Sequence, residues 1–104
     1  MPLPPPLTAD ERREALEKAA QARRERADLK LSLKQGDTTL EGLLDRTDEK
    51  VVGSMKVTDM LESLPGVGPV RAQKIMDRLA ISSTRRLRGL GEKQRRSLIQ
   101  EFSA

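Results

Sequence analysis

Residues 56–80 read KVTDMLESLPGVGPVRAQKIMDRLA, and this stretch decides the fold of the chain. Apolar residues recur at i, i+3, i+4 and i+7 before Pro65, a spacing that predicts the core-facing stripe of a short helix. Pro65 ends that helix, and Pro69 suits the first turn of another because a proline lacks the amide that would be unpaired there. We therefore expect two short helices joined by a tight turn. Their apolar stripes are Val57, Met60, Leu61 and Leu64, then Ala72, Ile75, Met76 and Leu79.

The turn Gly66-Val67-Gly68 predicts a site where the backbone comes close to a ligand. Its two glycines permit a sharp turn and close approach, and the amides that start the next helix favour an anion. Arg71, Lys74 and Arg78 follow at i, i+3 and i+7, on one face away from the apolar stripe. A Walker-type nucleotide loop is excluded, because no strand precedes the turn and no lysine followed by Ser or Thr is present.

The segment after this motif is also basic. Ser82-Ser83-Thr84 offers helix caps, and we expect a short turn of helix that carries Arg85, Arg86 and Arg88. Glycines at 89 and 91 interrupt it. A last helix over residues 92–102 is expected to bury Leu98, Ile99 and Phe102.

The N-terminal part of the chain predicts one long helix. Thr8-Ala9-Asp10-Glu11 is a capping-box pattern, and residues 9–34 contain neither glycine nor proline. Apolar residues are few along it, so most of its surface is expected to face water. Its exposed arginines are interpreted as a solvated face, and a basic arm that reaches along a nucleic acid backbone is the alternative. Gly36 ends the helix, and Thr38-Thr39 predicts the cap of a short acidic helix. Residues 47–53 are interpreted as a connecting loop.

These elements predict an all-α chain, since no alternating pattern and no internal repeat is present. A long N-terminal helix packs on, or projects from, a small C-terminal helical domain. Four prolines within the first six residues favour an extended, disordered lead, for which a role as a proline-rich ligand is the alternative. The expected segments are a lead (1–7), a long helix (8–35), a short acidic helix with connector (36–55) and a C-terminal domain (56–104).

The charge is distributed unevenly. The chain has 20 Lys and Arg against 16 Asp and Glu, a net charge of +4. Residues 1–36 carry +2, residues 37–55 carry −3, and residues 56–104 carry ten basic and five acidic side chains, or +5. A phosphate polymer responds to a local basic surface, so the C-terminal part is the expected binding region.

Residue types that are absent exclude most enzyme chemistry. The chain has no His, Cys, Tyr or Trp, which removes Ser-His and Cys-His nucleophiles, zinc sites and disulfides. Acidic pairs such as Asp45 and Asp48 are interpreted as solvated charges, and we expect no catalytic residue, no cofactor and no metal held by side chains. A metal bound by main-chain carbonyls at the Gly66-Val67-Gly68 turn stays open. No run of 18 apolar residues and no secretion signal is found, so we expect no membrane contact and a cytoplasmic protein.

The single phenylalanine disfavours single-stranded nucleic acid, whose bases stack on aromatic rings. Duplex backbone is the better partner. No recognition helix with Asn or Gln at its front is evident, so phosphate contacts with weak sequence preference are expected.

The quoted stretch, its continuation ISSTRRLRGLG (residues 81–91) and the basic helical arm together resemble the actinobacterial integration host factor family. The resemblance covers most of the chain from Thr8 to Phe102, and residues 61–79 and 85–91 are its specific parts. It implies an all-α, monomeric, nucleoid-associated protein with a helix-two-turns-helix motif. It also implies largely sequence-independent binding of double-stranded DNA, DNA bending or compaction, an influence on supercoiling and a part in phage integration.

The resemblance further implies that the glycine turn with the start of the following helix, and the arginine cluster, touch DNA. It also implies a phage integrase as a possible partner. We add Lys56 to the candidate DNA contacts. Whether one monomer bridges two duplexes stays open. An RNA-binding ribosomal protein with the same motif is the main alternative, although the basic tail typical of such proteins is missing. A DNA glycosylase with a proline nucleophile is a weaker one, since no zinc-finger cysteines accompany Pro2. The candidate contacts are Lys56, Gly66, Val67, Gly68, Arg71, Lys74, Arg85, Arg86 and Arg88.

Overall fold

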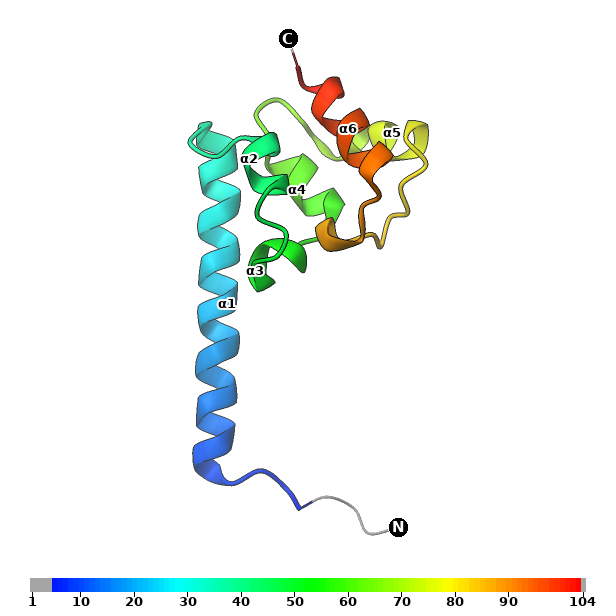
Figure 1. Ribbon diagram of the computed structural model, residues 1–104. Helices are drawn as coiled ribbons and strands as arrows, with labels where there is room; N and C mark the ends of the chain where they lie inside the picture. The colour runs from blue at the N-terminus through cyan, green and yellow to red at the C-terminus, as the bar shows by residue number, and fades with distance from the viewer. Residues whose placement is uncertain (1–4, 104) are drawn as a thin grey trace.

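The computed structural model describes residues 5–103, and this part of the chain contains helices and no strand. A single isolated antiparallel bridge joins Lys56 and Arg86. The α-helices lie beside and around a small core, with the long first helix along one side (Figure 1). Their bounds are α1 (Ala9–Gln35), α2 (Leu40–Leu44), α3 (Lys50–Gly53), α4 (Val57–Ser63), α5 (Pro69–Arg78) and α6 (Glu92–Glu101), with a 3-10 helix, η1 (Leu87–Gly89), before α6.

Helix α1 begins and ends where the capping residues predict. The Thr8 hydroxyl accepts a hydrogen bond from the Glu11 amide, and Gly36 adopts a left-handed conformation while its amide bonds to the last turn. The C-terminal half of α1 packs against α3 and α4, whereas the N-terminal half projects beyond the rest of the molecule (Figure 1). Leu33 is the one buried residue of the helix, so packing depends on its last turns.

The core joins the last turn of α1 to α2, α4, α5 and α6. Helix α4 is central to it, because three of its seven residues are buried and it contacts both α1 and α5. Ala72, Ile75 and Met76 of α5 face this core as their spacing predicts. Leu79 is only partly buried beside them.

Two local predictions are wrong. Residues 50–53 form α3 and not a loop, because Val52 packs into the core and Gly53 lies against the main chain of Thr47. Arg85 and Arg86 are not helical either. The Arg85 carbonyl and the Leu87 amide pair with the main chain of residues 55–57, and only residues 87–89 then form a turn of 3-10 helix.

The proline-rich lead falls partly outside the described residues, which begin at Pro5. Pro5, Pro6 and Leu7 are exposed and belong to no helix. The expectation of disorder over residues 1–4 lies beyond what the structure describes.

Candidate nucleic-acid interface

The turn between α4 and α5 is a tight hairpin anchored from inside. Gly66 has a φ of +74°, a left-handed conformation that strains any residue with a Cβ. The next residue, Val67, is only 6% exposed, and its amide bonds to the Leu64 carbonyl at 3.2 Å. Val67 therefore holds the hairpin on the core, and any ligand contact from this position must come from its main chain.

Gly68 differs from Gly66, because its φ of −93° is open to every residue. A Cβ added at Gly68 would meet no atom within 4 Å. The fold would therefore accept a larger residue at this position. Glycine is needed here only if a ligand comes close to the main chain.

The start of α5 presents unpaired amides beside basic side chains. No described side chain caps this helix, and Pro69 at its start has no amide of its own. Lys74 is exposed and has no ion-pair or hydrogen-bond partner among the described residues. Arg71 reaches back toward the Gly66 carbonyl (3.5 Å) and lies 5.6 Å from the centroid of the Phe102 ring. We call Gly66, Val67, Gly68, Arg71 and Lys74 the hairpin site.

One exposed apolar residue beside the hairpin site, Val70, is not among the candidates predicted from the sequence. Val70, in the first turn of α5, is 69% exposed, the most exposed of the large apolar side chains among the described residues. The signal that could have found it is its position, since it lies outside the apolar stripe of α5 and directly follows Pro69.

A second basic group surrounds the isolated bridge. Lys56 and Arg86 lie directly opposite each other, flanked by hydrogen bonds from the Val57 amide to the Arg85 carbonyl and from the Leu87 amide to the Met55 carbonyl, both 2.9 Å. Both residues are exposed, so the bridge carries a basic side chain on each of its two segments. An anion bound here would be attracted from both segments.

The three arginines of this segment are not equivalent. The guanidinium of Arg86 donates to the Ser54 carbonyl, and that of Arg85 donates to the Gly89 carbonyl at 2.7 Å. Both bonds brace the segment. Arg88 is exposed and has no partner among the described residues, so its charge is free to meet a ligand. We call Lys56, Arg85, Arg86 and Arg88 the bridge site.

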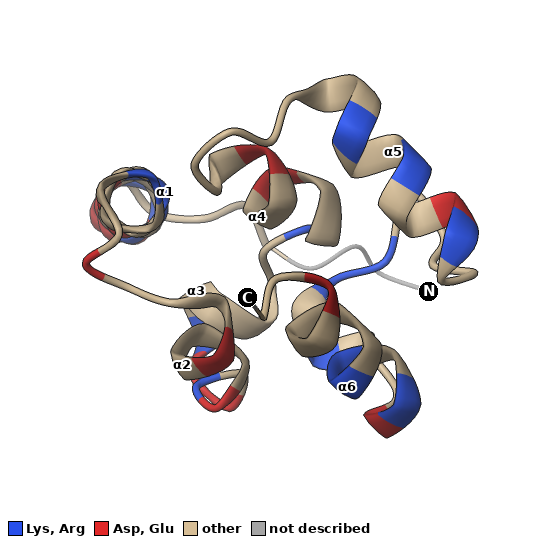
Figure 2. Cartoon of the chain, turned by 90° about the horizontal axis from the view of Figure 1, so that it is seen from above, with Lys and Arg blue, Asp and Glu red and all other residues tan. Residues whose placement is uncertain are grey.

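The structure does not bring the two sites together. Lys56 directly precedes α4 and the hairpin directly follows it, so they lie about 12 Å apart along the helix axis. Basic residues colour α5 and α6, on the far side of the molecule from α1 (Figure 2). Arg78, on the basic face predicted for α5, pairs with Glu101 of α6 at 2.5 Å and is partly neutralised.

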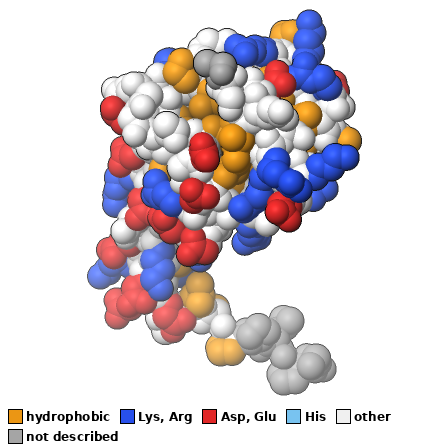
Figure 3. Space-filling view, turned by 45° about the horizontal axis from the view of Figure 1, so that its top comes forward, with side chains coloured by type: hydrophobic (Ala, Val, Ile, Leu, Met, Phe, Trp, Pro, Cys, Tyr) orange, Lys and Arg blue, Asp and Glu red, His pale blue; other side chains and the backbone are white. Residues whose placement is uncertain are grey.

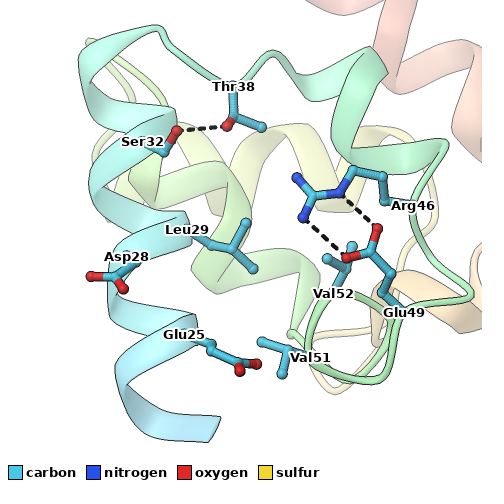
Figure 4. A pocket seen from close by; sticks show the side chains of 9 residues that line it. All are labelled: Glu25, Asp28, Leu29, Ser32, Thr38, Arg46, Glu49, Val51 and Val52. Atoms are coloured by element: carbon cyan, nitrogen blue, oxygen red, sulfur yellow. Dashed lines mark hydrogen bonds and ion pairs between the residues drawn. The ribbon is translucent and has the colours of Figure 1, made fainter. Parts of the chain in front are cut away.

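The surface around α2 is different, because acidic side chains lie beside apolar ones there (Figure 3). A cavity of about 480 Å³ opens nearby between α1 and the α2–α3 segment (Figure 4). Glu25, Asp28 and Glu49 line it, and a hydrogen bond from Arg46 lowers the pKa of Glu49. Three carboxylates against one guanidinium disfavour phosphate, so we expect this cavity to lie outside a nucleic-acid interface.

Comparison with known proteins identifies the family. A family model described as an S13-like H2TH domain matches residues 33–102. A curated relative from Streptomyces coelicolor named Integration host factor is 54% identical over 101 residues, which cover 96% of this chain and 94% of the relative. The chain belongs to the integration host factor family. A relative of the same name from Mycobacterium tuberculosis is also 54% identical over 101 residues, 96% of each chain.

A solved member of the integration host factor family has the same fold. It is described as sIHF bound to an 8 bp palindromic DNA, and it shares 53% of its sequence with this chain. The match has a TM-score of 0.82 and covers 84% of this chain and 99% of the solved one. The all-α fold with its helix-two-turns-helix motif and the resemblance to this family are thereby confirmed.

Most of α1 lies outside the matched H2TH domain, since the family model begins at Leu33. Within residues 5–103, no helix is long and apolar enough to cross a membrane. The same residues contain no group of three or more acidic side chains placed to hold a metal ion.

Proposed function

We propose that this chain is a nucleoid-associated protein that binds duplex DNA through the phosphate backbone with little sequence preference. The observation that carries this proposal is the solved relative, which has the same fold at 53% identity and is described as bound to palindromic DNA. We propose a binding role and no catalytic one.

The hairpin site supplies phosphate contacts through the main chain. Free amides at the start of α5 face a space that no Cβ occupies at Gly66 or Gly68, so a phosphate oxygen can approach within hydrogen-bonding distance. Lys74 adds a full positive charge in the next turn. Exposed Val70 is placed to make apolar contact with a sugar.

The bridge site supplies contacts through side chains. Lys56 and Arg88 extend into solvent, while Arg85 and Arg86 are braced by main-chain carbonyls and keep protons available for a second acceptor. A phosphate bound at this bridge could accept charge-assisted hydrogen bonds from both Lys56 and Arg86.

Both sites suit double-stranded DNA. The main-chain amides and cationic groups recognise phosphate and carry no sequence information by themselves. Phe102 is the single aromatic residue of the chain, and Arg71 lies over one face of its ring. One ring cannot form the series of stacking platforms on which successive unpaired bases bind.

DNA bending or compaction is part of this proposal, because the resemblance to the integration host factor family implies it. The two sites at the ends of α4 can engage phosphates of one duplex, and that duplex need not bend to reach both. If each site holds a different duplex, one monomer bridges two duplexes instead. Either mode constrains supercoils and could help a phage integrase bring its sites together.

A competition experiment tests the proposal. A labelled duplex of random sequence is bound by the full chain and then displaced by unlabelled duplex, single-stranded DNA or structured RNA at two salt concentrations. We expect duplex to displace best and a changed base sequence to have little effect. Preferential displacement by RNA would contradict the DNA proposal and support the ribosomal alternative, which the S13-like description of the domain favours.

A further inference from the structure

An apolar groove without a partner opens at the end of the molecule where α1 finishes. It has a volume of about 310 Å³ and lies between the start of α2, the hairpin and the end of α6. Leu64, Ile99 and Phe102 line it and are only partly buried. The groove is visible as a continuous apolar strip on this face (Figure 3). We call it the apolar groove.

A second apolar feature lies at the opposite end of α1. The lead, residues 1–7, reads MPLPPPL and contains only apolar side chains. Leu7, which the structure describes, is 53% exposed and does not belong to the hydrophobic core. Proline-rich segments bind apolar grooves that contain aromatic rings, because they lose little conformational entropy on binding. The one aromatic ring of this chain, Phe102, lines the apolar groove.

The two features cannot meet within one molecule. Helix α1 has 27 residues and is about 40 Å long, with the lead before it and the apolar groove beside the residues that follow it. Seven residues span at most about 25 Å when fully extended. A contact between the lead and the apolar groove must therefore join two copies.

We propose that the lead of one copy docks in the apolar groove of a second copy. Such a contact joins different surfaces on the two partners, so it is head-to-tail. It closes into a ring where the rotation between copies allows and otherwise forms an open chain of copies. A short lead in a small groove binds weakly, and free copies remain mostly monomeric. Copies bound side by side on DNA have a high effective concentration, and the contact then connects them. The apolar groove borders the hairpin at Pro65, so each link lies next to a DNA site.

Paramagnetic NMR tests the contact without DNA, so its outcome is independent of the proposed function. The chain has no cysteine, and a Pro2→Cys variant can carry a single nitroxide label. This unenriched variant is mixed with ¹⁵N-enriched wild-type chain at high concentration. We expect selective broadening of the amides of Leu64, Ile99 and Phe102. No broadening beyond that from free nitroxide, or broadening centred on another surface, would overturn the proposal.

A matched pair of acceptor variants sharpens the result. Ser103 is exposed and lines the apolar groove, so Ser103→Arg should fill the groove while the core stays intact. Gln100 is exposed on the same helix but does not line the groove, so Gln100→Arg serves as its control. We expect the broadening to disappear in the first variant and to persist in the second. Equal broadening in both would overturn the proposal.

Discussion

Gly66 and Gly68 lie two residues apart in the hairpin but are constrained differently. A Gly66→Ala substitution places a Cβ at φ +74°, and we expect it to destabilise the fold by about 1–2 kcal/mol. A Gly68→Ala substitution meets no atom and leaves an ordinary φ, so stability should hardly change. The new methyl group should nevertheless keep a phosphate away from the start of α5 and weaken duplex binding.

Thermal unfolding and duplex titration of the two variants separate these effects. The sequence alone gives both glycines the same role, and the backbone conformation distinguishes them. If the Gly68→Ala variant binds duplex as tightly as the parent chain, the hairpin main chain does not contact DNA.

A substitution at Lys56 should weaken DNA binding without lowering the stability of the fold. The Lys56 side chain is exposed and has no hydrogen-bond or ion-pair partner among the described residues, so we expect Lys56→Ala to leave stability unchanged. Loss of one phosphate contact should weaken duplex binding and reduce the salt slope by about 1. Arg12→Ala, on the projecting half of α1, is the matched control and should change neither. A lower melting temperature with unaltered affinity would assign Lys56 a structural role.

At the scale of elements, α3 depends on a contact that the sequence does not reveal. A Cβ at Gly53 would clash with the main-chain carbonyl of Thr47, so Gly53→Ala should cost about 1–3 kcal/mol. Urea unfolding compared with the Gly68→Ala variant checks this prediction. Equal stability of the two variants would mean that α3 can shift without cost.

Helix α1 is held by its last turns. Leu33 is fully buried, and Leu33→Ala should lower the free energy of unfolding by about 2–5 kcal/mol. Leu16 is 68% exposed on the projecting half, and Leu16→Ala should have almost no effect. Urea denaturation of both variants measures the difference, and a large effect at Leu16 would show that the projecting half packs against something in solution.

The sequence correctly predicts those helices whose ends and buried faces depend on residues close together in the chain. The caps at Thr8 and Gly36, the stripe of α4 and Pro69 at the start of α5 lie where the sequence indicates. The segment at Arg85 and Arg86 was predicted as helix because its caps are local, whereas its extended form depends on pairing with residues about 30 positions earlier. Contacts of that kind leave no periodic pattern in the sequence.

At the scale of the whole molecule, the sequence predicts that the C-terminal part is basic but not how its charges are arranged. The +5 of residues 56–104 separates into a hairpin site and a bridge site, and Arg78 is drawn into an ion pair. Only the fold shows that α4 keeps the two sites apart. One monomer therefore carries both candidate sites, one at each end of α4.

The central claim is that the chain binds duplex DNA through phosphates, and the salt dependence of the dissociation constant tests it most directly. Titrations of one duplex between low and physiological salt should give a straight log–log plot. If three to six basic groups engage, its slope should be about −3 to −6, because each phosphate contact contributes about −0.9. A slope near zero, with affinity maintained, would contradict the account.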